Sequence, residues 1–91
     1  MRVRWTTNAA NDLSRMVERI RAESPEAALH VARTLYNGVA ELGKFPRRGR
    51  VGLVENTREL VFPPWPYIVV YEVTGDQVVV LRVRHASRNW P

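Results

Sequence analysis

Apolar residues recur at helical spacing through the first half of the chain and predict two amphipathic helices. Thr6 or Thr7 can cap the start of the first helix. The second begins at Ser24-Pro25-Glu26, which is typical of an N-cap, a first-turn proline and an acid favoured by the helix dipole. The predicted apolar faces comprise Ala9, Leu13, Met16, Val17 and Ile20 in the first helix, and Ala28, Val31, Ala32, Leu35, Val39 and Leu42 in the second. Because so short a connection joins them, we expect an antiparallel helical hairpin that ends at Gly43.

Alternating apolar and polar positions predict strands on both sides of this hairpin. We expect a short strand at residues 2–5 and three extended segments at residues 53–62, 67–73 and 77–84. Asn56-Thr57 favours a left-handed turn or bulge inside the first extended segment, and the prolines of residues 63–66 predict a stiff, unpaired connector. Thr74-Gly75-Asp76 predicts a tight hairpin between the last two strands.

These elements predict an α+β fold in the order β-α-α-β-β-β, with the helical hairpin packed on one face of a small, mostly antiparallel sheet. The 91 residues, 45% of them apolar, fit one domain spanning residues 1–91. With no cysteine, a disulfide framework and a thiolate metal site are both excluded. The N-terminal residues lack the apolar stretch of a signal peptide, and no run approaches the roughly 18 apolar residues of a membrane span. We therefore expect a soluble cytoplasmic protein without a cofactor.

Charge is placed unevenly along the chain. The net charge is +5, and residues 44–91 hold eight basic and four acidic residues, whereas residues 1–43 hold six and five. A basic surface attracts polyanions through long-range attraction and counterion release, although a solvated, solubilising face explains the same composition. If the basic surface binds a polyanion, the predicted nucleic-acid-binding residues are Lys44, Arg47, Arg48, Arg50, Arg84, Arg88 and Trp90.

The last predicted strand is the most informative segment, because it ends in a cluster of cations. If Val79, Leu81 and Val83 face the helices, strand alternation places Arg82 and Arg84 on the open face of the sheet. Desolvating a cation is costly without a counter-charge, so these side chains need a partner within the fold or outside it. The register of residues 58–62 stays open: Arg58 joins Arg82 on the open face while Glu59 points away, or the reverse.

The chain also resembles the RelE/ParE toxin superfamily, which includes plasmid stabilisation proteins. The resemblance rests on an ordered set of motifs: Trp5 before a capped helix, Phe45-Pro46 with Gly49-Arg50 and Gly52, Asn56-Thr57-Arg58-Glu59-Leu60, Pro66-Tyr67-Ile68-Val69-Val70-Tyr71, and Leu81-Arg82-Val83-Arg84-His85 before Arg88-Asn89-Trp90-Pro91. It implies the toxin of a type II toxin-antitoxin module, bound and neutralised by a cognate antitoxin protein.

Two activities are implied by this resemblance. RelE-like members cut mRNA in the ribosomal A site without a metal, and ParE-like members inhibit DNA gyrase without cleaving anything. For an endoribonuclease, the resemblance places phosphate-stabilising arginines at Arg58 and Arg82 and a catalytic histidine at His85. Glu55 and Glu59 are unranked candidates in this chain for the other proton-transfer group. We expect the ribonuclease, acting on the ribosome and its mRNA, and retain the gyrase inhibitor as the alternative.

Three features of the chain count against assigning these catalytic roles by resemblance. RelE-like enzymes place a tyrosine near the C-terminus, whereas this chain has Trp90, which can stack on a base but cannot donate a proton as readily. A histidine near the end of the last strand also occurs in ParE-like members. Structural roles are open as well: His85 as a strand-end cap, and Arg58 in an ion pair with Glu72 across the sheet.

Overall fold

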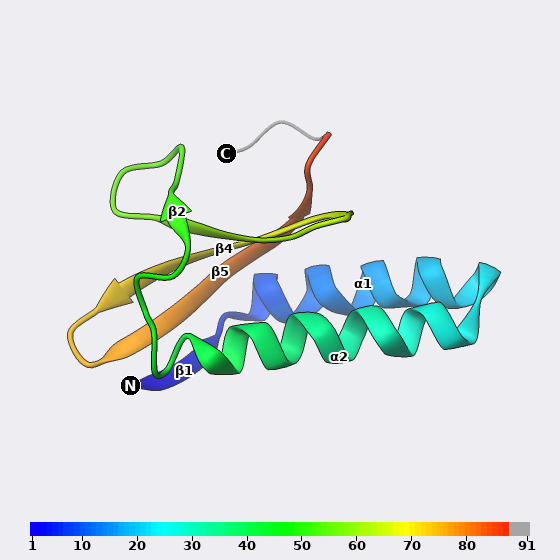
Figure 1. The fold of residues 1–91 in the computed structure, drawn as a ribbon, viewed down its shortest axis with the longest axis horizontal. Helices are drawn as coiled ribbons and strands as arrows, with labels where there is room; N and C mark the ends of the chain where they lie inside the picture. The colour runs from blue at the N-terminus through cyan, green and yellow to red at the C-terminus, as the bar shows by residue number, and fades with distance from the viewer. Residues whose placement is uncertain (88–91) are drawn as a thin grey trace.

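A computed structural model describes residues 1–87 of the 91-residue chain and shows two layers, a helical hairpin under one face of a five-stranded sheet (Figure 1). The helices are α1 (Thr7–Glu23) and α2 (Pro25–Glu41). The strands are β1 (Arg2–Trp5), β2 (Arg50–Val51), β3 (Arg58–Phe62), β4 (Trp65–Thr74) and β5 (Gln77–His85). The predicted α+β fold is confirmed, with β2 as one short strand more than the sequence pattern predicted. Among the described residues, neither helix is long and apolar enough to cross a membrane.

The helix boundaries follow the predicted capping residues. Thr6 is the N-cap of α1, where its hydroxyl accepts a hydrogen bond from the Ala9 N–H at 3.1 Å. Ser24 caps α2 in the same way through the Ala27 N–H, and Pro25 occupies the first turn. Ser24 also ends α1, since its own N–H donates to the Ile20 carbonyl at 2.8 Å. One residue therefore ends the first helix and starts the second, which makes the hairpin tight.

The strands lie in the order β1-β5-β4-β3-β2, so the first and last strands of the chain are neighbours. β1 pairs with β5 in parallel, from Arg2 opposite Gln77 to Trp5 opposite Val80, and the other pairs are antiparallel. β1 covers only the first part of β5. The remainder of that β5 edge, from Leu81 onward, lies beside the start of α1.

A β-bulge in β5 decides which residues face the helices. The register between β4 and β5 shifts where Tyr71 lies opposite Val80 and Val70 lies opposite Arg82, so Leu81 is the extra residue. The shift puts Val78, Val80 and Val83 together in the core under the sheet. Our prediction that Val79 and Leu81 face the helices was wrong, because simple alternation does not allow for the extra residue.

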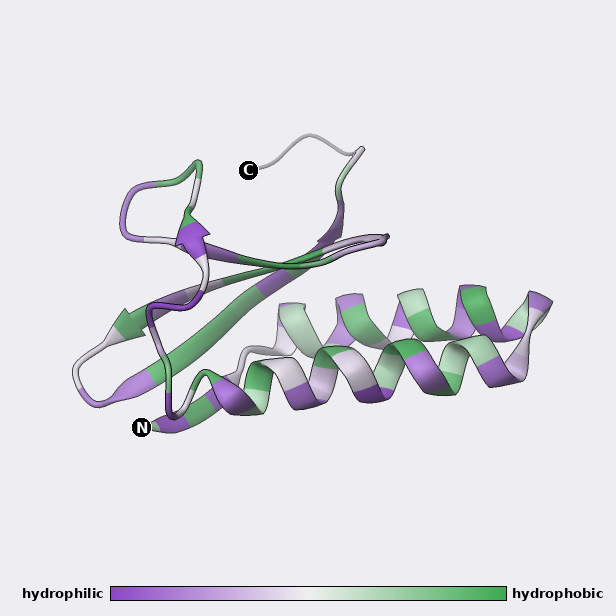
Figure 2. Ribbon diagram, in the orientation of Figure 1, coloured by the Kyte–Doolittle hydropathy of each residue, from purple (hydrophilic) through white to green (hydrophobic). Residues whose placement is uncertain are grey.

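The core lies between the helices and the sheet. Its buried members are Ala9 from α1, Val31, Leu35, Val39 and Leu42 from α2 and its end, and Leu60, Val69, Tyr71, Val78, Val80 and Val83 from the strands. Leu13, Met16 and Ile20 pack against this cluster, as their helical spacing predicts. Apolar stretches run along the ribbons of β4 and β5 (Figure 2). Ile68, Val70 and Val79 are buried too, outside this cluster.

Two of three predicted turns are confirmed. Gly75 adopts φ +60° in the β4–β5 hairpin, and Asn56 adopts φ +66° before β3. The prediction for residues 63–66 was wrong, since Trp65 pairs with Phe62 and β4 includes Pro66. Only Pro63 and Pro64 form the turn.

Candidate functional site

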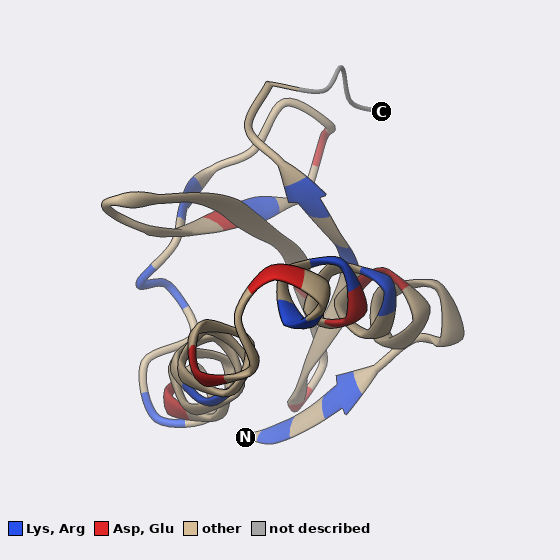
Figure 3. Ribbon diagram, turned by 90° about the vertical axis from the view of Figure 1, so that its right-hand side faces the viewer, with Lys and Arg blue, Asp and Glu red and all other residues tan. Residues whose placement is uncertain are grey.

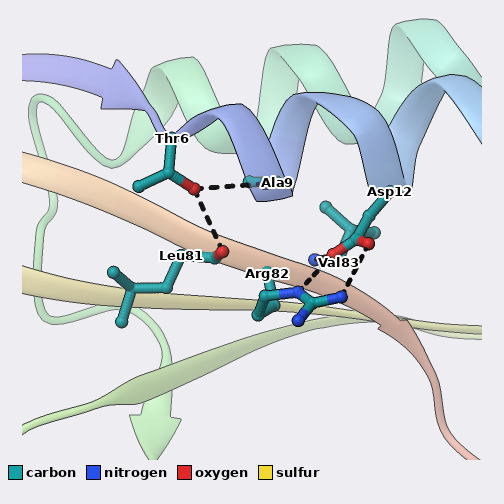
Figure 4. A network of polar contacts seen from close by, with 6 residues as sticks. All are labelled: Thr6, Ala9, Asp12, Leu81, Arg82 and Val83. Atoms are coloured by element: carbon teal, nitrogen blue, oxygen red, sulfur yellow. Dashed lines mark hydrogen bonds and ion pairs between the residues drawn. The ribbon is translucent and has the colours of Figure 1, made fainter.

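The free edge of β5 beyond β1 is held by α1 through one acid. Asp12 accepts hydrogen bonds from Arg82 through both carboxylate oxygens, at 2.8 Å from Nε and 2.9 Å from a terminal guanidinium nitrogen (Figure 4). The same carboxylate accepts the Val83 N–H at 3.0 Å. A backbone N–H at the sheet edge, which a neighbouring strand would otherwise bind, is thus satisfied by a helix side chain.

Thr6 completes this junction between helix and strand. Its N–H donates to the Val80 carbonyl. Its hydroxyl donates to the Leu81 carbonyl at 3.1 Å and accepts the Ala9 N–H (Figure 4). The bulged residue of β5 is therefore bonded to the N-cap of α1.

Charge stabilisation at the junction follows from these contacts. Burial works to raise the pKa of the Asp12 carboxyl, but the hydrogen bonds from Arg82 and Val83, with the charges of Arg82 and Arg15, prevail and hold that pKa below its usual value. The hydrogen bond to Asp12 raises the pKa of Arg82 in turn. The Asp12 side chain is 9% exposed and that of Arg82 38%, so the acid is enclosed and the base reaches solvent.

A second ion cluster lies on the sheet face away from the helices. Glu59 is buried, and its two carboxylate oxygens bind different arginines: Arg50 Nε at 3.0 Å and Arg84 at 3.2 Å. Arg84 is itself largely enclosed, whereas Arg50 is mostly exposed. One carboxylate therefore joins β2, β3 and β5 across the sheet, and the charge of this face is partly balanced internally.

Arg58 holds the basic loop before β2. One of its guanidinium nitrogens donates to the Gly49 carbonyl at 2.8 Å and reaches the Arg47 carbonyl at 3.4 Å. Tyr71 holds the same loop: its hydroxyl accepts the Gly49 N–H at 2.8 Å and donates to the Pro46 carbonyl at 2.7 Å. A Cβ on Gly49 would lie 2.7 Å from the Tyr71 hydroxyl, so the close approach requires glycine.

His85 lies at the end of β5. Its Nδ1 accepts the Ser87 N–H at 3.1 Å and lies 2.7 Å from the Ser87 hydroxyl oxygen. Its ring meets Tyr67 edge to face, with centroids 5.9 Å apart. In the neutral imidazole these contacts place the proton on Nε2.

The structure does not bring the three predicted catalytic residues together. Arg58 lies opposite Tyr71 and Arg82 opposite Val70, so these two arginines start from opposite faces of the sheet. The open register is thus resolved, with Glu59 and not Arg58 on the face of Arg82. Arg58 has loop carbonyls as partners, not Glu72. The three catalytic assignments stay predictions.

The predicted nucleic-acid-binding residues are spread over several elements. Lys44, Arg47 and Arg48 are exposed on the loop after α2, and Figure 3 shows cationic residues there, on β1 and on β5. Arg50 and Arg84 share Glu59, and Glu55 is exposed in the turn before β3. Arg88 and Trp90 lie outside the described residues.

Sequence reasoning missed Asp12 and Tyr71. Asp12 follows Ala9 by three positions and precedes Met16 by four, so it lies on the apolar face of α1, where an acid signals a buried partner. Tyr71 gave no comparable signal, because a core tyrosine and a loop anchor look alike in sequence.

Comparison with known proteins defines the family. The family model described as ParE toxin of type II toxin-antitoxin system, parDE, matches residues 3–90. The chain belongs to the ParE toxin family. A ParE toxin is the toxin of a type II module, and its partner is a cognate antitoxin.

Individual relatives agree with this assignment to the ParE toxins. Putative toxin Y4kP of Sinorhizobium fredii is 38% identical over 90 residues, covering 99% of this chain and 93% of the relative. Toxin RelE2 of Caulobacter vibrioides is 38% identical over 84 residues, covering 92% and 93%. The chromosomal ParDE system of P. aeruginosa contains a chain with a TM-score of 0.85 and 27% identity, covering 96% of this chain and 97% of that one. The ParE fold and the toxin class therefore extend over nearly the whole chain.

Proposed function

We propose that this ParE toxin arrests growth by binding and inhibiting DNA gyrase, and that it cleaves no nucleic acid. The observation that carries the proposal is the separation of Arg58 from Arg82. Metal-independent RNA cleavage needs cations and proton-transfer groups converging on one phosphate, within hydrogen-bond reach of it. Here the two arginines start from opposite faces of the sheet, and each has a structural partner.

The partners of these arginines support a structural role. Arg82 ties the bulge in β5 to α1, and Arg58 ties the loop of residues 46–50 to β3. Moving either guanidinium to a scissile phosphate would break those contacts. These hydrogen bonds hold the loop and the bulge in place. A preorganised surface loses less entropy when it binds, which suits an inhibitor that acts by occupying its target.

The test is a supercoiling assay with purified gyrase, relaxed plasmid and the purified chain. We expect inhibition at micromolar concentration, and we expect His85→Ala to inhibit as well as the unchanged protein, because a binding inhibitor needs no proton carrier. A matched substitution at the other histidine, His30→Ala on α2, controls for loss of an imidazole. Undisturbed supercoiling at these concentrations would refute the proposal.

The ribonuclease is the second candidate, favoured by the exposed Lys44, Arg47 and Arg48 and by the partial exposure of His85. It is tested by adding the chain to a translating extract and mapping mRNA 5′ ends. Codon-positioned cuts that disappear in His85→Ala but persist in His30→Ala would establish it.

A further inference from the structure

A hollow of about 640 Å³ opens where β3 begins and β4 ends. Its walls are formed by Arg47 from the loop before β2, Val51 from β2, the turn of Asn56 and Thr57, Arg58 from β3, and residues 72–75 of the β4–β5 hairpin. It is open to solvent and lies at the end of β5 opposite His85, since Gln77 starts that strand and His85 ends it.

An unpaired stretch of sheet edge borders this hollow. β3 begins at Arg58, opposite Tyr71, while β4 continues for three more residues to Thr74. Glu72, Val73 and Thr74 pair with β5 on one side, and within residues 1–87 no strand pairs with them on the other. An edge of this kind offers backbone N–H and C=O groups to an added extended peptide.

The walls combine positive charge with apolar surface. Arg58 is fixed there by its hydrogen bonds to the Gly49 and Arg47 carbonyls, and the Arg47 side chain is exposed beside it. Val51 is 79% exposed and Val73 is 37% exposed. Glu72 is the one acid among the described lining residues. A carboxylate is therefore favoured at the Arg47 and Arg58 side, and an apolar side chain is favoured near the two valines.

The turn that forms one wall is held by hydrogen bonds within itself. Thr57 is buried, its hydroxyl donates to the Val54 carbonyl, and its own carbonyl accepts the Gly52 N–H at 2.8 Å. A Cβ on Gly52 would collide with the Thr57 hydroxyl, so this turn closes only with glycine there. The hollow is thus built before any partner arrives, which reduces the entropy lost on binding.

We infer that this hollow binds an extended, acidic segment of the cognate antitoxin. The segment adds to the edge of residues 72–74, places a carboxylate against Arg47 and Arg58, and lays a neighbouring apolar side chain on Val51 and Val73. A nucleic acid fits this surface less well, because it offers no strand backbone and no aliphatic side chain and meets Glu72. The inference deepens the antitoxin partnership of the ParE family and does not depend on gyrase being the target.

Two matched pairs of substitutions test the inference. Arg47 lines the hollow and its neighbour Arg48 does not, though both are exposed, so Arg47→Glu and Arg48→Glu change the net charge equally. Likewise Val51 lines the hollow, while Leu53, 73% exposed, does not. The pairs separate local contact from general electrostatic attraction.

The measurement is the Kd of each purified variant for the purified cognate antitoxin by isothermal titration calorimetry. We expect Arg47→Glu to weaken binding about tenfold or more and Arg48→Glu to change it less than about threefold. Val51→Ser should weaken binding measurably, and Leu53→Ser should not. Equal effects within each pair would overturn the inference, and thermal unfolding of each variant establishes that it is folded.

A supercoiling assay on Val51→Ser distinguishes the antitoxin from the toxin's target. We expect this variant to inhibit gyrase as the unchanged chain does and to require more antitoxin for neutralisation. If instead it loses inhibition and keeps its affinity for antitoxin, the hollow belongs to the target and the inference is wrong. If the unchanged chain leaves gyrase unaffected, only the proposed function fails, because the Kd comparison is independent of it.

Discussion

Replacing Asp12 should destabilise the fold more than its place on a helix suggests. Its carboxylate is 9% exposed and accepts the Val83 N–H as well as two bonds from Arg82. In Asp12→Ala the Val83 N–H is left without its acceptor, which lowers the free energy of unfolding by about 1–3 kcal/mol. Arg82 is 38% exposed and becomes solvated instead, so losing its ion pair adds only about 0.5–1 kcal/mol. We expect about 2–3 kcal/mol in total.

Asp12→Asn separates the two contributions. The amide oxygen still accepts the Val83 N–H, while the charge that attracts Arg82 is lost, so we expect about 1 kcal/mol. The ion pair itself is measured by a double-mutant cycle in which Asp12→Asn is combined with Arg82→Met. We expect a coupling free energy of about 0.5–1 kcal/mol.

Urea unfolding followed by tryptophan fluorescence gives these free energies, provided that the slope m stays constant. For a domain of this size, a loss of 2–3 kcal/mol lowers Tm by roughly 10–20 °C. The reasoning would be refuted if Asp12→Ala unfolded within about 0.5 kcal/mol of the unchanged protein, or if Asp12→Asn were as damaging as Asp12→Ala.

The dependence of stability on acidic pH provides an independent test of the role of Asp12. Because the pKa of Asp12 is lower in the folded state than in the unfolded chain, the folded state binds fewer protons between these two values. The stabilisation is present above the ordinary pKa of about 3.9 and is lost as the pH falls through the folded value. Asp12→Asn should therefore lose less stability between pH 5 and pH 2 than the unchanged protein, and parallel pH curves would contradict the assignment.

Three further predictions concern the loop anchor and the second ion cluster. Tyr71→Phe removes the acceptor of the Gly49 N–H and the donor to Pro46, so we expect a loss of about 1–3 kcal/mol in urea unfolding and faster amide exchange at Gly49. Burial raises the pKa of Tyr71, so the unchanged protein should lose stability as the pH rises above about 10. Tyr71→Phe should lose less stability over the same range, and equal losses would show that ionisation of Tyr71 is not the cause. Glu59→Gln removes the carboxylate charge beside the enclosed Arg84 and should cost about 2–4 kcal/mol. Glu55→Gln in the exposed turn should change stability by less than about 0.5 kcal/mol, and similar effects of the two substitutions would refute the burial argument.

The helical hairpin and the β4–β5 hairpin were predictable because local chemistry determines them. Ser24-Pro25 and Thr74-Gly75-Asp76 each favour one backbone conformation whatever surrounds them. The faces of β5 before Leu81 were not predictable, because the extra residue there reverses the pattern and alternation gives no sign of it, whereas Val83 and Arg84 lie on the predicted faces.

The site was harder to predict than the fold, since its contacts join distant residues. Arg82 and Asp12 are 70 positions apart, and Arg84 and Glu59 are 25 apart. Sequence reasoning required that these cations find counter-charges, and the structure provides them within the fold. Arg82 and Arg84 therefore have counter-charges within the fold and need no external anion.

The pairing of the first strand with the last affects how the toxin forms during its synthesis. β1 leaves the ribosome before the other elements of this domain, yet its partner on β5, residues 77–80, is made only after both helices and β2, β3 and β4. The helical hairpin can form early, because its contacts are local, but the central sheet cannot close until β5 has emerged. The sheet of the nascent toxin therefore stays open while both helices and the three strands between them are made, and β1 gains its partner only when residues 77–80 emerge.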